Sequence, residues 1–538
     1  MKLRRPDRIT VFSGISAFLL SATFAIGPLF TGNSSKLVCV LSFLMYLPIF
    51  WLATYKLYGF FDKLTKRRVR KVDLAETRFS FKNFWLFFAI IIIPSILLLL
   101  AFWPGHFGYD VGGELLGEGV YSDHHPLIHV LWLHGIVRIG NLLNLSPNWT
   151  VALMSISQII LCAVIYAYIS EFFSRITSRK CGIFVALLFA LLPASSFAMI
   201  AITKDTVHVA MFCLVVTLVY RLFCLKSPAK RDIVAFVAIA GLFGVTRNNS
   251  IYILALFGIF SFFLLKRHAL RKTMTICTFS SLVVAVLLNA GLAAYAHPYK
   301  LQASAAFSLP LQLVAGTVDA HPELIPEINS GEKILGFFEY SSDFNTYDFF
   351  SKGSDVTKNN SYAKQIEGRE LEFLLLTART GLRYPADYLR VFGDQTLSSW
   401  YPFSYDYAYY YYKFGGQLNF NESTTQQTAI LSNVQDSSKI PFLRDFLSYE
   451  FRELHYRDNP ILLFLCAPAS YVLALLVLAL YLAYRKDRIL FLVASLALSC
   501  YFVILIAAPC ILIRYMLPIM LAVPLLYLLK LRSRARIY

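Results

Sequence analysis

Long apolar runs, separated by short polar and basic segments, dominate the pattern of the chain. A helix needs roughly 20 mostly apolar residues to cross the hydrocarbon core of a bilayer, and about twelve runs approach this length. They cover residues 9–31, 36–58, 84–103, 148–170, 181–201, 204–225, 231–246, 249–265, 272–294, 459–484, 487–508 and 511–530. The pattern therefore predicts an all-α polytopic membrane protein with about twelve transmembrane helices.

Clusters of lysine and arginine give this set of helices an orientation. They lie at residues 2–5, 63–71, 175–180, 226–231, 266–272, 485–488 and 530–536. The twelve runs place every cluster on the same side of the membrane, and basic loops favour the cytoplasmic side. We therefore expect a multi-pass protein of the cell membrane with both termini in the cytoplasm.

The segment 126–145 is apolar enough to be considered as a further span. If it crossed the membrane, however, the basic cluster at 175–180 would move to the outside. His129, His134 and Arg138 are expected on one side of a helix here. The segment is therefore predicted to be an amphipathic helix lying in the outer interface, after the first large external loop.

Four regions follow from this topology. Residues 1–83 would hold two transmembrane helices and a basic cytoplasmic loop, and residues 84–296 would form the transmembrane core with its external loop at 104–147. Residues 297–458 are long enough for a small extracytoplasmic domain, either α or α+β. Residues 459–538 would add the last transmembrane helices and a basic tail.

Composition supports the membrane assignment and excludes several other classes. The chain is 57% hydrophobic and only 15% charged, whereas a soluble domain is about 25% charged. The net charge of +18 comes from short clusters between apolar runs, which argues for membrane lipids as partners and against nucleic acid. Walker, Rossmann, HExxH and GxSxG motifs are absent from the sequence, as is any CxxC pair that would indicate a zinc site built on thiolates.

The first external loop carries a group of acidic and histidine side chains close after a predicted membrane helix. A partly desolvated carboxylate in such a place can act as a general base or bind a metal. The alternative is an ordinary polar loop, since loops are polar by default. The candidates are Asp110, Glu114, Asp123, His124 and His125.

Basic residues also occur at the predicted outer ends of apolar runs, against the positive-inside trend. They are Lys204 beside Asp205, Arg247 beside Asn248, and Arg514. Charges at a membrane boundary are costly and often functional, so these residues suggest an anionic ligand on the outer side. Alternatively, Lys204 and Asp205 satisfy each other, and the arginines bind lipid headgroups or helix ends.

The late polar segment from Arg383 to Phe414 is rich in aromatic residues and includes Asp394 and Trp400. Aromatic faces with nearby acids suit sugar rings, because the C–H faces of a sugar stack on them. An aromatic belt at the membrane interface would give the same pattern. The sequence leaves both interpretations open.

Several of these motifs, taken in order, resemble the GT-C superfamily of membrane glycosyltransferases. The chain is most similar to an uncharacterised bacterial multi-span family near the protein mannosyltransferase-like branch, over residues 84–520. The motifs are an Asp after Pro-Gly in WPGHFGYD, the stretch Ser122–Pro126, Thr203-Lys204-Asp205, Arg247-Asn248-Asn249, the segment Arg383–Pro402, and Arg514-Tyr515 with Pro518. The chain departs from the pattern at Glu114, where a Gln or a similar residue is expected, and at Tyr384-Pro385, where His-Pro is expected.

The resemblance implies an enzyme that moves a sugar from a polyprenyl-phosphate-linked donor, with inversion, to an envelope glycan, lipid or protein acceptor on the outer face. Asp110 would be the general base, and Lys204, Arg247 and Arg514 would hold the donor phosphate. No cofactor is expected, although Asp110 and the histidines leave a divalent metal open. The other residues expected to bind substrate are Glu114, Asp123, His124, His125, Asp205, Asn248, Tyr515, Asp394 and Trp400.

Two other functions use the same outer charges. A transporter or flippase for a lipid-linked saccharide would also bind an anionic lipid, but it should carry charge deep within several spans. A non-catalytic protein of envelope assembly would keep the bundle without an active site.

Overall fold

The structure is a computed structural model of the 538-residue chain. It describes residues 7–32, 34–66, 73–108, 110–115, 119–266, 268–299, 307–321, 323–324, 366–404, 434–435, 437–452, 455–508 and 511–532. Almost all of the regular structure in these ranges is helical.

Within the described residues, nine helices are long and apolar enough to cross a membrane. They are α1 (Arg8–Phe30), α2 (Lys36–Lys66), α3 (Phe81–Ala101), α6 (Pro147–Ile176), α9 (Lys204–Phe223), α12 (Arg271–Ala296), α21 (Pro468–Arg485), α22 (Arg488–Ala507) and α23 (Ile513–Arg532). A tenth results if α7 (Arg179–Leu191) and α8 (Pro193–Ile200), bent by 61°, count as one span. The chain is thus a helical, multi-pass membrane protein.

The expected number of about twelve spans is not confirmed. Two predicted runs form α10 (Lys230–Thr246) and α11 (Ser250–Leu264), which have 17 and 15 residues. At 1.5 Å per residue, a 15-residue helix is only about 22 Å long. The run 459–484 is broken at Ala467 into α20 (Pro460–Cys466) and α21. Pro468 causes this break, because a proline disfavours helical geometry at the residue before it.

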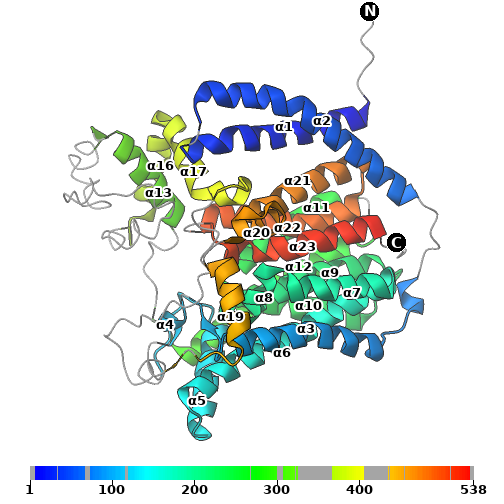
Figure 1. The fold of residues 1–538 in the computed structure, drawn as a ribbon, viewed down its shortest axis with the longest axis vertical. Helices are drawn as coiled ribbons and strands as arrows, with labels where there is room; N and C mark the ends of the chain where they lie inside the picture. Colours follow the sequence, from blue (N-terminus) through cyan, green and yellow to red (C-terminus); the bar gives the residue numbers. More distant parts are fainter. Residues whose placement is uncertain are drawn as a thin grey trace, which may run out of the picture.

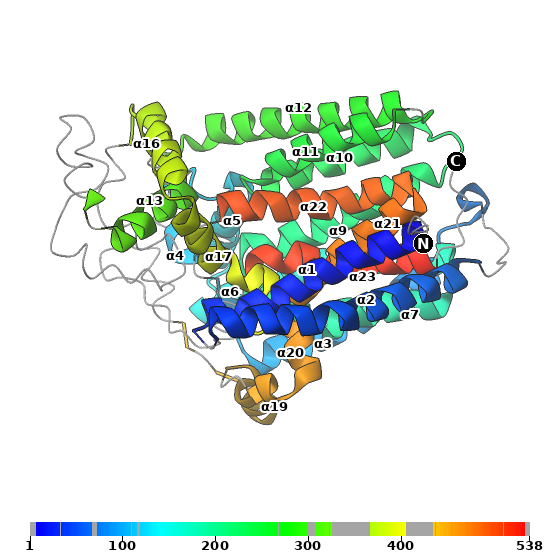
Figure 2. The ribbon, with the colours of Figure 1, turned by 90° about the horizontal axis from the view of Figure 1, so that it is seen from above.

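The long helices run side by side, with α9 near the centre of the bundle (Figures 1 and 2). Most of α9 is buried, and it packs against α6, α10, α22 and α23. In contrast, α2 and α12 expose large apolar side chains such as Leu41 and Leu287. A helix that is apolar on its exposed face is typical of contact with lipid rather than water.

The two ends of the bundle differ in character (Figure 2). The two chain termini lie at one end, called here the terminal end. The opposite end, called the loop end, carries the short helices α4 (Val111–Glu114), α5 (Leu127–Leu142), α13 (Ser308–Ala320), α16 (Glu370–Arg383) and α17 (Pro385–Trp400). The helix α9 begins at the loop end with Lys204, so the predicted outer residues gather there.

The segment predicted as an amphipathic helix forms α5, which has 16 residues. His129 and His134 are buried, whereas Arg138 is exposed. The expectation that these three side chains share one side is therefore wrong. Both histidines turn inward because they bond to Glu114 of the neighbouring loop.

The described part of residues 297–458 is helical, apart from an isolated bridge between Tyr299 and Ser122. Two of its helices, α13 and α16, enclose a small apolar core, and α17 packs against both. The shorter elements α19 (Pro441–Leu447), η6 (Ser448–Arg452) and η7 (His455–Asp458) follow. Residues 325–365 and 405–433, which include most of the predicted aromatic run, lie outside the described residues.

The bundle's orientation leads to a labelling experiment. Val120 lies at the loop end and Lys226 follows α9 at the terminal end, and both are exposed. In intact cells, a Val120→Cys variant should react with a membrane-impermeant thiol reagent, and Lys226→Cys should react only after the membrane is opened. The unmodified protein gives the background from native cysteines. Labelling of Lys226→Cys in intact cells would contradict the orientation expected from the basic clusters.

Candidate functional site

A short parallel strand pair ties the first external loop to the start of α9. His106 and Phe107 of β1 (His106–Phe107) pair with Ala201 and Ile202 of β2 (Ala201–Ile202). The close approach requires glycine, because a Cβ at Gly108 would lie 2.8 Å from the Ile202 carbonyl oxygen. Since Asp110 follows β1 and Lys204 follows β2, the pairing brings these two residues together.

Asp110 and two basic residues from distant segments form the centre of the site. The Lys204 Nζ donates to Oδ2 of Asp110 at 2.8 Å. The Nη1 of Arg514, near the start of α23, donates to the same oxygen at 2.9 Å. Lys204 lies 94 residues from Asp110 in the sequence and Arg514 lies 404 residues away, so only the fold brings this triad together.

A second carboxylate, that of Glu114, is more deeply buried than that of Asp110. Its side chain is 2% exposed, with Oε2 at 2.6 Å from Nδ1 of His129 and Oε1 at 3.6 Å from Lys204 Nζ. His125 also contacts the lysine, whose Nζ donates to the imidazole Nδ1 at 2.7 Å. Lys204 thus lies among Asp110, Glu114 and His125, and Glu114 is a buried partner of the lysine.

Arg247 and Asp205 form the adjoining pair, joined by a 2.6 Å contact between Nη1 and Oδ1. Asp205 Oδ2 also lies 4.0 Å from Arg514 Nε, which connects this pair to the Asp110 triad. The Tyr515 ring lies 4.7 Å and 4.8 Å from the guanidinium carbons of Arg247 and Arg514, within the range of cation–π attraction. We call Asp110, Glu114, Lys204, Asp205, Arg247 and Arg514 the charged cluster.

The charged cluster has an inner and an outer layer. The Glu114 and Asp205 side chains are almost fully buried, whereas Asp110, Arg247 and Arg514 keep partial exposure. Each carboxylate is matched by a cation, so burial of these charges is compensated. The outer layer is the part that an anion arriving from the loop end would meet first.

The charges and the burial of the site keep the Asp110 and Glu114 carboxylates ionised and the His125 imidazole neutral. Burial raises the pKa of Asp110, but the Lys204 and Arg514 charges outweigh it and hold that pKa well below its ordinary value. For Glu114, burial is outweighed by His129 and Lys204, and its pKa is also lowered. Burial, assisted by the Lys204 ammonium, lowers the pKa of His125 to about 3. Neutral His125 can therefore accept the lysine's hydrogen bond at Nδ1.

Three further predicted residues join the external loop to the bundle. The Asn248 side chain donates to the backbone carbonyls of Asp123 and His124, both at 3.3 Å. His124 itself is exposed, with its ring 4.5 Å from that of His125. Asn248 thus fixes the backbone beside the charged cluster, and His124 extends from the same turn.

The two predicted residues of the late segment lie on α17. Trp400 packs its ring edge-on against Phe30 at the end of α1, with 5.4 Å between centroids. Asp394 is half-buried in the middle of the helix, beside Gln395, which bonds to the Ala508 carbonyl. This hydrogen bond holds α17 against Ala508, a few residues before the start of α23. The expected stacking of a sugar on Trp400 stays a prediction.

Within the described ranges, no group of three or more histidine, cysteine or carboxylate side chains is placed to hold a metal ion. The Lys204 ammonium already contacts Asp110, Glu114 and His125.

Sequence reasoning missed the side chains that support the site from behind. His129 and His134 bond to the carboxylate and the backbone carbonyl of Glu114. Gln158 on α6 donates to the carbonyls of Met199 and Ala201, which fixes β2. The two histidines were visible as polar positions in an apolar helix, but Gln158 carries no comparable signal.

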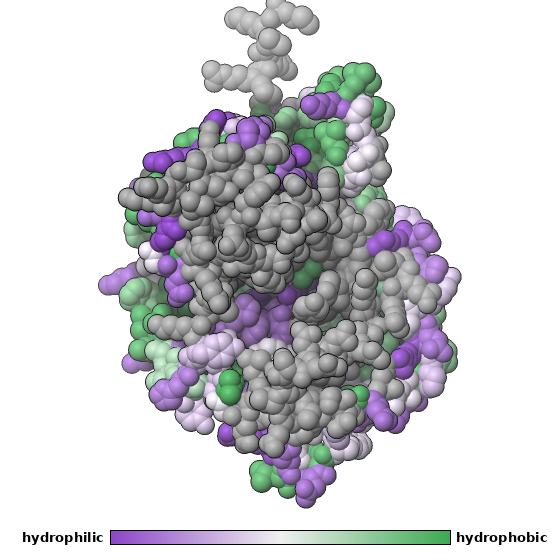
Figure 3. Space-filling view, turned by 90° about the vertical axis from the view of Figure 1, so that its left-hand side faces the viewer, coloured by the Kyte–Doolittle hydropathy of each residue, from purple (hydrophilic) through white to green (hydrophobic). Residues whose placement is uncertain are grey.

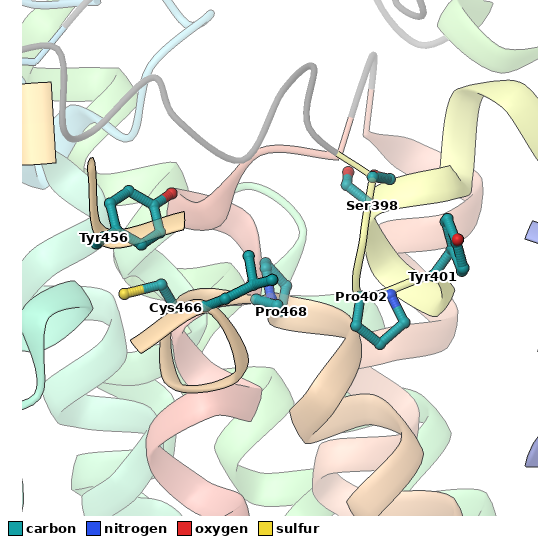
Figure 4. Close-up of a pocket in the computed structure, with 9 residues that line it drawn as sticks. Ser398, Tyr401, Pro402, Tyr456, Cys466 and Pro468 are labelled. Carbon is teal, nitrogen blue, oxygen red and sulfur yellow. The ribbon is translucent and has the colours of Figure 1, made fainter. Parts of the chain in front are cut away.

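The loop end shows hydrophilic side chains near the middle of its face (Figure 3). A separate small pocket lies where α17 meets α20 and α21 (Figure 4). Its lining includes no residue of the charged cluster: it consists of Ser398, Tyr401, Pro402, Ser404, Tyr456, Leu463, Cys466, Ala467 and Pro468. The pocket and the charged cluster are therefore separate features of the loop end.

The shifted pKa of His125 predicts a pH effect on stability. In the unfolded chain the imidazole titrates near 6.5, whereas the folded protein keeps it neutral to about pH 3. Between these values the unfolded chain binds the extra proton, so folded-state stability falls as pH drops below 6.5. In detergent, the unfolding temperature of wild type should fall between about pH 7.5 and pH 5 by more than that of His125→Asn.

The matched control is His124→Asn, which removes the exposed neighbouring imidazole and should keep the wild-type pH dependence. The window ends above the ordinary pKa values of aspartate and glutamate, so Asp110 and Glu114 contribute little to the difference. Parallel curves for wild type and His125→Asn would contradict the assignment of a neutral, buried His125.

Comparisons with known proteins give a family without an assigned activity. No curated protein and no solved structure matches the chain significantly. One family model matches residues 117–537, which include the charged cluster except Asp110 and Glu114. The chain belongs to this family of unknown function, DUF6020.

Proposed function

We propose that the protein is a membrane glycosyltransferase that moves a sugar from a polyprenyl-phosphate-linked donor to an envelope glycan, lipid or protein acceptor on the outer face. The observation that carries the proposal is the convergence of Lys204 and Arg514 on a single oxygen of Asp110 at the loop end. A carboxylate that could serve as a general base thereby lies beside two cations that suit a phosphate.

The cations suit a phosphate attached to a lipid. Arginine and lysine are the usual side chains that donate hydrogen bonds to phosphate in proteins, and partial burial strengthens these hydrogen bonds. A polyprenyl donor is anchored in the bilayer and delivers its phosphate at the ends of the spanning helices. The partly exposed Arg247 and Arg514 side chains occupy that level in the bundle.

Asp110 plays two roles in this proposal. At rest it neutralises Lys204 and Arg514, and those cations keep its pKa low, so it is a weak base. When the donor phosphate binds, its oxygens take over the hydrogen bonds from the two cations. Burial then acts on Asp110 with less opposition, its pKa rises, and the carboxylate becomes a stronger base.

The transfer step follows from these positions. The acceptor hydroxyl oxygen bonds to the anomeric carbon while Asp110 takes the hydroxyl proton. The bond between the anomeric carbon and the phosphate oxygen breaks, and polyprenyl phosphate leaves with the electron pair. Lys204 and Arg514 stabilise the charge that develops on this leaving group. Attack from the face opposite the phosphate inverts the anomeric configuration.

Two carboxylates of the charged cluster and two neighbouring histidines hold the cations in place. Glu114 and His125 fix the Lys204 ammonium, and His129 fixes Glu114. Asp205 fixes Arg247. These partners are mostly buried, so their proposed roles are positioning, without contact to the sugar.

Asp110→Asn should abolish most of the transfer activity. The amide keeps the size of the side chain but cannot accept the proton, and loss of a general base costs about 10²–10⁴-fold in rate. Cell-surface glycans should lack one sugar, and the comparison is made at matched protein abundance, because the substitution also removes an ion-pair partner of Lys204 and Arg514. The matched control is Asp232→Asn, because Asp232 pairs with Arg221 at 2.7 Å at the terminal end. Unchanged glycans in Asp110→Asn cells would refute the transferase mechanism.

The affinity for polyprenyl phosphate should respond differently to a change at Asp110 and to a change at Arg514. Arg514→Gln removes a charged donor and should weaken binding of polyprenyl phosphate in detergent by about tenfold or more. Asp110→Asn removes the anion that competes with the phosphate and should bind it at least as tightly as wild type. A comparable loss of affinity in both variants would contradict displacement of Asp110.

A further inference from the structure

The helix α16 carries an apolar stripe on the side that faces away from the protein. Leu371, Leu374, Leu375 and Leu382 are all exposed, Leu371 by 71% and Leu382 by 85%. Together with Ala378 they fall within an arc of about 100° on a helix of 3.6 residues per turn. Such a stripe is the pattern by which a helix buries one face against an apolar phase.

The opposite side of α16 already has its packing partner. Phe373 is fully buried in the small core that α16 forms with Leu311 and Val314 of α13. The Thr377 carbonyl accepts a hydrogen bond from the Tyr388 hydroxyl of α17 at 2.7 Å. The exposed leucines therefore form a second apolar face, which the packing of the three helices does not require.

The direction of α16 fits a membrane surface. The helix runs across the direction of the spanning helices at the loop end, where α12 and α22 end (Figure 2). A helix in this position lies along the plane of a bilayer that the bundle crosses. Leu389 of α17 is a further exposed leucine, by 72%, in the helix that follows.

Charge beside the stripe completes the pattern. Arg379 and Arg383 are exposed on one flank of α16, and Arg390 is exposed on α17. Arginine side chains at a membrane interface extend toward lipid phosphates while their stems lie along apolar surface. An apolar stripe flanked by arginine is typical of helices that lie in the headgroup region of a bilayer.

We infer that α16 is an interfacial helix that inserts its leucine stripe into the outer leaflet of the membrane, with phospholipid as its partner. The inference does not depend on the proposed transferase activity. Through the contacts of α13 and α17 with α16, these three helices are anchored together to the bilayer surface.

The experiment uses the full-length protein in lipid nanodiscs. Single cysteines at Leu374 and Leu382 carry an environment-sensitive fluorophore, and the lipids carry bromine on their acyl chains as a contact quencher. Both labels should lose fluorescence relative to nanodiscs of unbrominated lipid. The matched controls are Glu372→Cys and Arg379→Cys, which are exposed on the polar flank of the same helix and should be quenched much less.

Two results would overturn the inference. Equal, weak quenching at all four positions would place the leucine stripe in water. Unquenched labels at Leu374 and Leu382, together with disulfide crosslinking of Leu374→Cys between two copies, would make a second copy of the chain the partner. These substitutions remove no buried contact, so the fold should survive and each outcome can be interpreted.

Discussion

The Lys204 ammonium is the group on which the loop end of this protein depends. It lies almost buried at the first position of a membrane-spanning helix and contacts Asp110, Glu114 and His125. An unpaired ammonium in such a place would be very costly. Partners for this ammonium come from the loop before α5. The strand pair and the inward-facing histidines of α5 hold that loop in place.

In the proposed function, this arrangement connects stability with activity. Removal of one partner from a buried ion pair typically costs about 3–5 kcal/mol, because the other charge is left uncompensated. A ligand that replaces one anion with another keeps the cations compensated, and the cost then falls on the displaced carboxylate, which becomes a stronger base. A donor phosphate that takes the place of Asp110 keeps Lys204 and Arg514 paired throughout, and it converts a resting ion pair into a free carboxylate. The proposal thus explains how a compensated cluster can still be reactive.

Much of the fold was predictable from the sequence, because the bilayer imposes long apolar runs on any chain that crosses it. The span count was less predictable. Pro193 and Pro468 interrupt apolar runs that hydropathy treats as continuous, and α10 and α11 are shorter than a full span. A run of apolar residues indicates burial in lipid or protein, but it does not say where a helix bends.

The candidate site was predictable in part for a similar reason. Lys204, Arg247 and Arg514 stood out because charge at the outer ends of apolar runs is costly, whereas Asp110 came from the resemblance and from its loop. The pairing of Asp110 with Arg514 depends on packing between segments 404 residues apart, which no local pattern encodes. His129 was visible in the sequence, but its role depends on the inward position of Glu114, which a loop pattern does not reveal.

The central claim is that Asp110 occupies the place of a substrate phosphate at rest. A structure of the protein with a polyprenyl phosphate bound tests it most directly. The account predicts the phosphate oxygens within hydrogen-bonding distance of Lys204 and Arg514, with the Asp110 carboxylate released from both. A phosphate bound elsewhere, with Asp110 still paired to Lys204 and Arg514, would contradict the account.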